Sequence, residues 1–155
     1  MTAHDCYVRE HEVVNLFAFG HLVPLFIREQ LQLTQIGIEY PVRQAQIKVA
    51  WKPCPRKDLV IWQEAHSTAW NGGKPLAVIE WKHISKLTKR VQAVRREHKS
   101  DIDWLMKNRD AMGVGFAIMV ERSASTVKLT CVKVGQDGAA DWLVLPGAKA
   151  VSASS

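Results

Sequence analysis

The chain has 155 residues, of which 47% are hydrophobic and 23% are charged, and it carries a formal net charge of +6. This length favours one domain with its own core, and the uncharged apolar runs fall short of the roughly 20 residues that a transmembrane helix needs. The first residues lack the basic start and apolar stretch of a signal peptide, and three scattered cysteines without CxxC spacing indicate neither a zinc site nor a disulfide framework. We therefore expect a cytoplasmic protein without a membrane segment, with a basic surface suited to an anionic partner.

The N-terminal part of the chain is predicted to form a helix and a first strand. Residues 10–31 place apolar side chains at helical spacing. Gly20 and Pro24 interrupt this pattern, and Pro24 is expected to kink the helix or split it in two. Residues 36–42 resemble a strand, and residues 44–51 either extend it or begin the next one.

Two strands that follow bring charged residues into apolar surroundings. Residues 57–62 and 75–83 are rich in β-branched and aromatic side chains, and an Asn-Gly-Gly-Lys turn lies between them, which predicts a hairpin. Alternation along the second strand places Glu80 and Lys82 on one face, and hairpin pairing brings Asp58 close to Glu80. Charges in apolar strands are costly unless they are paired or bind a metal, so this cluster is a candidate site.

The rest of the chain predicts a long helix and further strands. Residues 86–109 carry an apolar stripe at helical spacing, on which His98 is interpreted as a partly buried core histidine rather than a ligand. Residues 114–120 are nearly all apolar and suit a buried central strand. Residues 126–134 alternate as a strand does, a Gln-Asp-Gly turn follows, and residues 142–145 predict a last short strand.

These elements together predict the fold class. The order of one helix, three strands, a helix and further strands indicates an α/β domain with a mixed central sheet flanked by helices. We expect residues 1–147 to form this single domain and residues 148–155 to form a flexible C-terminal tail.

The order of elements, with Asp58 on the second strand and Glu80-Trp81-Lys82 on the third, resembles the PD-(D/E)XK nuclease superfamily. The resemblance covers residues 10–134 and implies the restriction endonuclease-like αβββαβ core. It implies that Asp58, Glu80 and the main-chain carbonyl of Trp81 hold Mg²⁺, with Mn²⁺ as a substitute. It also implies that Lys82 positions or activates the attacking water.

Two further points concern this resemblance. Many members carry a glutamate on the first helix, and Glu12 is the residue matched to that catalytic position, with Glu10 as the weaker choice. The chain departs from the motif at Lys57, which stands where the family name implies proline. The structural alternative is an ordinary salt bridge between Glu80 and Lys82 with Asp58 at a surface strand end, which contributes only about 0.2–1 kcal/mol.

Basic side chains crowd the segment after Lys82. They are Lys86, Lys89, Arg90, Arg95, Arg96 and Lys99. Beside a nuclease site they are expected to contact nucleic-acid phosphates, whereas on an isolated helix they form a solvated face.

The sequence thus predicts a Mg²⁺-dependent endonuclease that hydrolyses phosphodiester bonds in DNA. Small members of the superfamily often act as dimers, so a homodimer is one expectation. The alternative is a non-catalytic nucleic-acid-binding or protein-interaction module on the same fold, and a nuclease directed at RNA is a third, weaker interpretation.

Overall fold

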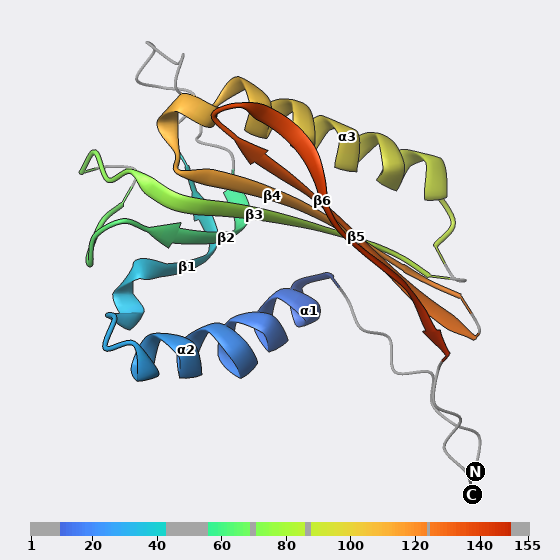
Figure 1. Cartoon of the computed structure of the whole chain (residues 1–155), viewed down its shortest axis with the longest axis horizontal. Helices are drawn as coiled ribbons and strands as arrows, with labels where there is room; N and C mark the ends of the chain where they lie inside the picture. The colour runs from blue at the N-terminus through green and yellow to red at the C-terminus, as the bar shows by residue number, and fades with distance from the viewer. Residues whose placement is uncertain (1–9, 43–55, 69–70, 86–87, 124, 150–155) are drawn as a thin grey trace, which may run out of the picture.

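A single mixed β-sheet with helices on both faces forms the molecule (Figure 1). The computed structural model describes residues 10–42, 56–68, 71–85, 88–123 and 125–149. Its elements are α1 (Glu10–Phe17), a π-helical segment (Ala18–Leu22), α2 (Val23–Arg28), β1 (Ile36–Pro41), β2 (Arg56–Trp62), β3 (Pro75–Ile84), α3 (Val91–Lys107), β4 (Val114–Arg122), β5 (Thr126–Gly135) and β6 (Gly138–Lys149), with short 3₁₀ turns at Leu33–Gln35 and Arg109–Ala111.

The strands lie side by side in chain order from β1 to β6. Neighbouring strands are antiparallel except β3 and β4, which are parallel. A parallel pair needs a crossover connection, and α3 supplies it. The mixed α/β architecture with flanking helices that the sequence predicts is therefore present. Among the described residues, no helix is both long enough and apolar enough to span a membrane.

The first helix shows how the chain accommodates Pro24. Proline has no backbone N–H, and its ring clashes with the carbonyl four residues before it. The structure places a π-helical segment there, in which the Val23 N–H bonds to the Ala18 carbonyl, and Pro24 falls in the first turn of α2. The helix therefore continues through the predicted interruption and keeps one buried stripe. That stripe is Val14, Ala18, Leu22 and Phe26.

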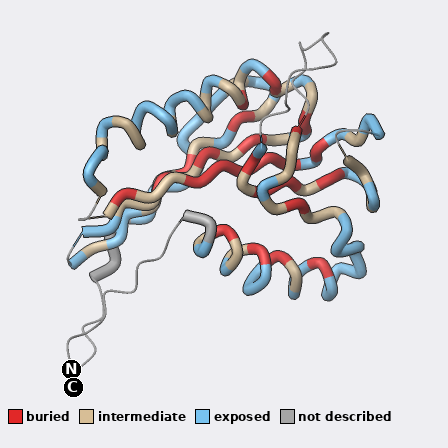
Figure 2. The backbone as a smooth tube through the Cα atoms, turned by 180° about the vertical axis from the view of Figure 1, so that it is seen from behind, coloured by how far each residue is buried: buried red, intermediate tan, exposed pale blue. Residues whose placement is uncertain are grey.

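The two faces of the sheet carry separate parts of the core (Figure 2). The face under α1 packs Val14, Ala18 and Leu22 against Leu59, Ile79 and Trp81. The face under α3 packs Leu105 and Met112 against Val78, Ala117 and Val134, with a neighbouring cluster of Val42, Val60 and Trp62 against Trp104. Alternate residues of β2 and β3 therefore face opposite helices, as the period of a strand requires.

The structure corrects two boundaries. α3 begins at Val91 rather than at Lys86, which lies outside the described residues, and before the helix the Ser85 N–H donates to Thr88 Oγ1. β6 is longer than the short strand predicted at residues 142–145, because its backbone keeps pairing with β5 up to Lys149 opposite Thr126. The first two residues of the predicted tail therefore belong to the sheet.

Candidate functional site

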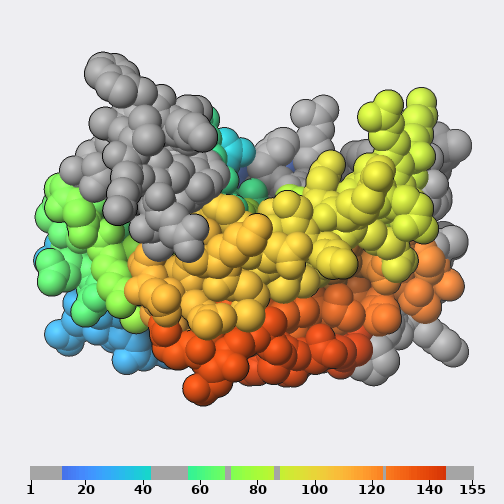
Figure 3. All heavy atoms as spheres, turned by 90° about the horizontal axis from the view of Figure 1, so that it is seen from above, coloured from blue at the N-terminus to red at the C-terminus, as the bar shows by residue number. Residues whose placement is uncertain are grey.

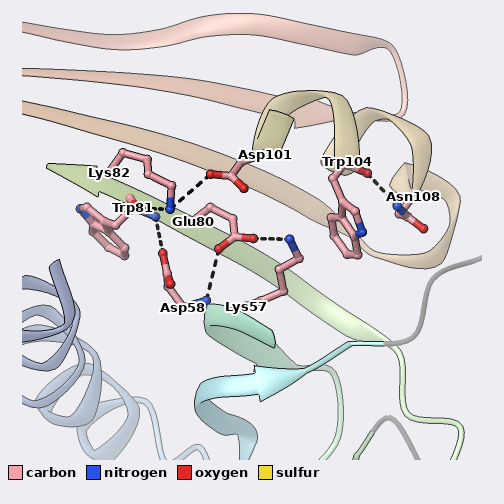
Figure 4. Close-up of polar contacts among 8 residues, drawn as sticks. All are labelled: Lys57, Asp58, Glu80, Trp81, Lys82, Asp101, Trp104 and Asn108. Carbon is pink, nitrogen blue, oxygen red and sulfur yellow. Dashed lines mark hydrogen bonds and ion pairs between the residues drawn. The ribbon is translucent and has the colours of Figure 1, made fainter. Parts of the chain in front are cut away.

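The site lies where β2 and β3 stop pairing through their backbones. The register pairs run from Trp62 opposite Pro75 to Leu59 opposite Ile79. One residue beyond, side chains take over the hydrogen bonds: the Trp81 N–H donates to Asp58 Oδ2 at 2.6 Å, and the Asp58 N–H donates to Glu80 Oε2 at 3.3 Å. The two carboxylates predicted from the sequence are thus brought together by the same pair of strands (Figure 4).

Glu80 is the most buried acid of this cluster, with 4% of its surface exposed. Its Oε1 forms an ion pair with the ammonium of Lys57. Burial raises the pKa of Glu80 from its ordinary value of 4.5 to about 7, even though Lys57 lowers it, and the nearby charges of Asp58 and Asp101 raise it further. The carboxyl group therefore changes its charge close to neutral pH.

Lys57 is a site residue that the sequence analysis did not propose. Simple alternation from Leu59 would place it under α1, but its ammonium lies on the other side, 3.8 Å from the ring centroid of Trp104 on α3. The lysine is only 5% exposed, and a carboxylate and an aromatic face are the two partners that make such burial tolerable. The available signal was a lysine inside an apolar strand, directly before Asp58.

Lys82 lies on the same side of the sheet as Glu80. Its Nζ donates to the Trp81 carbonyl at 3.0 Å and forms an ion pair with Asp101 Oδ2 on α3 at 3.5 Å. Burial raises the pKa of Asp101, although the charge of Lys82 lowers it. Asp101 is the second site residue that the sequence analysis missed, because its partner is brought close only by the packing of α3 on β3.

Three buried polar atoms on α3 make no hydrogen bond: His98 Nδ1, Trp104 Nε1 and Asp101 Oδ2, the last of which is in the ion pair with Lys82. Buried polar groups are normally hydrogen-bonded, so three in one row of a helix are unusual. Burial lowers the pKa of His98, which favours a neutral ring at neutral pH. His98 is half-buried on the helix, as the sequence predicts.

The donor chemistry of the cluster suits a hard divalent cation. Asp58 and Glu80 offer carboxylate oxygens and Trp81 a main-chain carbonyl, which are the oxygen types that Mg²⁺ binds. In the structure these oxygens accept from N–H groups and lysine ammonium groups. Within the described residues, no three side chains of the His, Cys, Asp or Glu type are close enough to hold an ion together. The oxygen atoms of the cluster are of the types that a divalent metal binds. One of them, Glu80 Oε1, is paired with the ammonium of Lys57.

Glu12, matched to a fourth catalytic position, is exposed on α1, the helix that covers the opposite face of the sheet from Glu80 and Lys82. The side chain of Glu10, the weaker choice, lies outside those described. The catalytic role given to Glu12 therefore remains a prediction from the resemblance.

The predicted basic residues that the structure describes lie on the outer side of α3 or just before the helix begins. α3 forms much of the face seen in Figure 3. Lys89, Arg90, Arg96 and Lys99 are exposed, whereas Lys86 lies outside the described residues. Arg95 is also exposed and pairs with Glu121 of β4 at 2.5 Å. The helix thus presents lysine and arginine side chains outward while Asp101 points inward to Lys82.

Comparison with protein-family models, curated proteins and solved structures finds no match for this chain. The interpretation of the site therefore depends on its own geometry and on the resemblance of its motif.

Proposed function

We propose that the protein is a Mg²⁺-dependent endonuclease that hydrolyses phosphodiester bonds in DNA, built on a PD-(D/E)XK plan. The observation that carries this proposal is the gathering of Asp58, Glu80 and Lys82 around the main chain of Trp81. The order of elements supports it as well, since the acids come from adjacent antiparallel strands and α3 leads into a parallel fourth strand.

Each residue has a role in the proposed reaction. Asp58, Glu80 and the Trp81 carbonyl hold the divalent ion, which when bound polarises a phosphoryl oxygen and lowers the pKa of a bound water. The ammonium of Lys82 orients the attacking water or offsets the charge that develops on the phosphate. The exposed basic residues of α3 contact the DNA backbone and fix its position.

The test is cleavage of plasmid, linear duplex, single-stranded DNA and four-way junctions with Mg²⁺ or Mn²⁺. We expect cleavage of at least one of these DNAs and a fall of about 100-fold or more for Lys82→Ala, because a preorganised charge at the reacting group is lost. Lys133→Ala is the matched control, since it removes the same charge from an exposed position on β5. Absence of cleavage of every substrate, or equal rates for wild type and Lys82→Ala, contradicts the proposal.

A second candidate is a non-catalytic binding module, and the ion pairs of the site favour it. Glu80 is paired with Lys57 and Asp101 with Lys82, so the cluster is partly neutralised without any ion. A thermal melt with added Mn²⁺ separates the two functions. An enzyme shows metal-dependent stabilisation that Asp58→Asn abolishes and Asp103→Asn, on the exposed side of α3, preserves. A binding module shows none.

A further inference from the structure

Lys82 is held from two sides by groups of different elements. On one side its Nζ donates to the carbonyl of Trp81 at 3.0 Å, and on the other it lies 3.5 Å from Asp101 Oδ2. Both side chains of the ion pair are largely buried, with 14% of Lys82 and 18% of Asp101 exposed. At this burial, water screens the pair less than it would at the surface.

A lysine side chain without such a partner has many rotamers. Fixing it in one conformation costs entropy, which contacts in the folded structure must offset. The Trp81 carbonyl orients the ammonium from the strand side. Asp101 adds a charged partner from α3, so the ammonium has a defined position relative to both layers.

Asp101 is the acid of α3 whose carboxylate lies beside the Lys82 ammonium. Asp103, two residues further along, is exposed on the outer side of the helix. Burial lowers the pKa of His98, one turn earlier, and outweighs the charge of Asp101, which raises it, so the neutral ring is favoured and Lys82 is the cation that pairs with Asp101. Asp101 Oδ2 lies 3.5 Å from the Lys82 ammonium, which acts on Asp101 more strongly than the more distant charge of Lys57.

We propose that Asp101 is a positioning residue, which holds the Lys82 ammonium beside the Trp81 carbonyl in the orientation that phosphodiester cleavage uses. The inference rests on the proposed nuclease function. It assigns α3 a part in the reaction in addition to DNA contact: the helix orients the lysine of a motif that is otherwise carried by β2 and β3.

The kinetic test compares Asp101→Asn with Asp103→Asn in the full chain, because both remove one negative charge from the same helix. We expect kcat of Asp101→Asn to fall by about tenfold to 100-fold with KM for DNA changed less than about twofold, since misplacement of a reacting group acts on the chemical step. Asp103→Asn keeps both constants. Asp101→Glu should keep most of the wild-type kcat, whereas Asp101→Gln should not. Glutamate and glutamine have the same length, so this pair tests the role of the charge if Asp101→Asn fails to fold.

A second readout does not depend on activity. In protein with ¹⁵N-labelled lysine, an ammonium group held in a buried ion pair exchanges its protons slowly and gives an observable Nζ resonance, which Lys82→Met assigns by its disappearance. We expect Asp101→Asn to abolish this resonance and Asp103→Asn to preserve it.

The two readouts distinguish the possible failures. If wild type cleaves no DNA but the resonance depends on Asp101, the nuclease proposal fails while the positioning contact stands. If wild type cleaves and Asp101→Asn matches its kcat, or the resonance is the same in both, the inference about Asp101 is wrong.

Discussion

At Glu80 and Trp81 the two faces of β3 are about equally buried but chemically opposite. Trp81 is 5% exposed and packs under α1 with Leu59 and Ile79, whereas Glu80 is 4% exposed and faces α3 with Lys57. The ring of Phe17 on α1 lies 5.1 Å from that of Trp81. One residue along a single strand therefore separates an apolar contact from an ion pair (Figure 4).

This difference indicates what each face of the sheet contributes to the stability of the fold. Apolar burial stabilises the fold by roughly 25 cal/mol per Å² removed from water, so the face under α1 needs no further explanation. A buried ion pair is often no better for stability than apolar residues of the same volume. We therefore propose that function accounts for the charged residues that face α3, and the predictions below compare these residues with the apolar face.

The largest effect is expected when the ammonium is removed from the charged face. At pH 9, Lys57→Met leaves the Glu80 carboxylate buried without its partner and should lower the free energy of unfolding by about 3–5 kcal/mol. The double variant Lys57→Met/Glu80→Leu should return to within about 1 kcal/mol of wild type, because no buried charge remains. Urea denaturation measures both. A single variant as stable as wild type would mean that the pair is not buried in solution.

The same face should give stability a pH dependence. Burial raises the pKa of Glu80 to about 7 in the folded protein, against 4.5 for the ordinary group. Between these values the folded state holds a proton that the unfolded chain has released, so this stabilising contribution is complete at low pH and is lost as pH rises through about 7. We expect wild type to lose at most about 3 kcal/mol relative to Glu80→Gln over this range. Parallel pH profiles of the two proteins would contradict the shift.

Substitutions in the apolar face should change the free energy of unfolding less, and by the same amount at every pH. Ile79→Val removes one methylene group from the cluster under α1 and should lower the free energy of unfolding by about 1 kcal/mol. The loss should be equal at pH 5 and pH 9, since no titratable group is involved. Urea denaturation at both pH values checks this, and a pH-dependent loss would show that the two faces are coupled.

The smallest effect on stability is expected at the outer surface of α3. Arg96→Gln, at an exposed position, should change the free energy of unfolding by less than about 0.5 kcal/mol. If Arg96 contacts a phosphate, the slope of log affinity for DNA against log salt should become shallower by about 0.9. Fluorescence anisotropy at several salt concentrations measures the slope, with Lys133→Gln on β5 as the control. An unchanged slope assigns Arg96 to the solvated face.

Much of the framework was readable from patterns in the chain. The hairpin of β2 and β3, the opposed directions of Glu80 and Trp81, and the long helix α3 follow from a period of two or of 3.6 residues. Pro24 was expected to kink or split the helix, and the structure instead has a π-helical segment, Ala18–Leu22, shortly before it. The boundaries were less accurate, since β6 continues through Lys149 because β5 offers it a partner.

The sequence by itself determined that two acids and a lysine would come from neighbouring strands of an α/β sheet, because strand alternation and hairpin pairing are local. Only the tertiary structure decided the partners of these groups. Lys57 crosses to the side of α3 where the β2–β3 ladder ends, and Asp101 reaches Lys82 across the layer between helix and sheet. Contacts between layers depend on how the whole chain packs, and no periodicity within one segment encodes them.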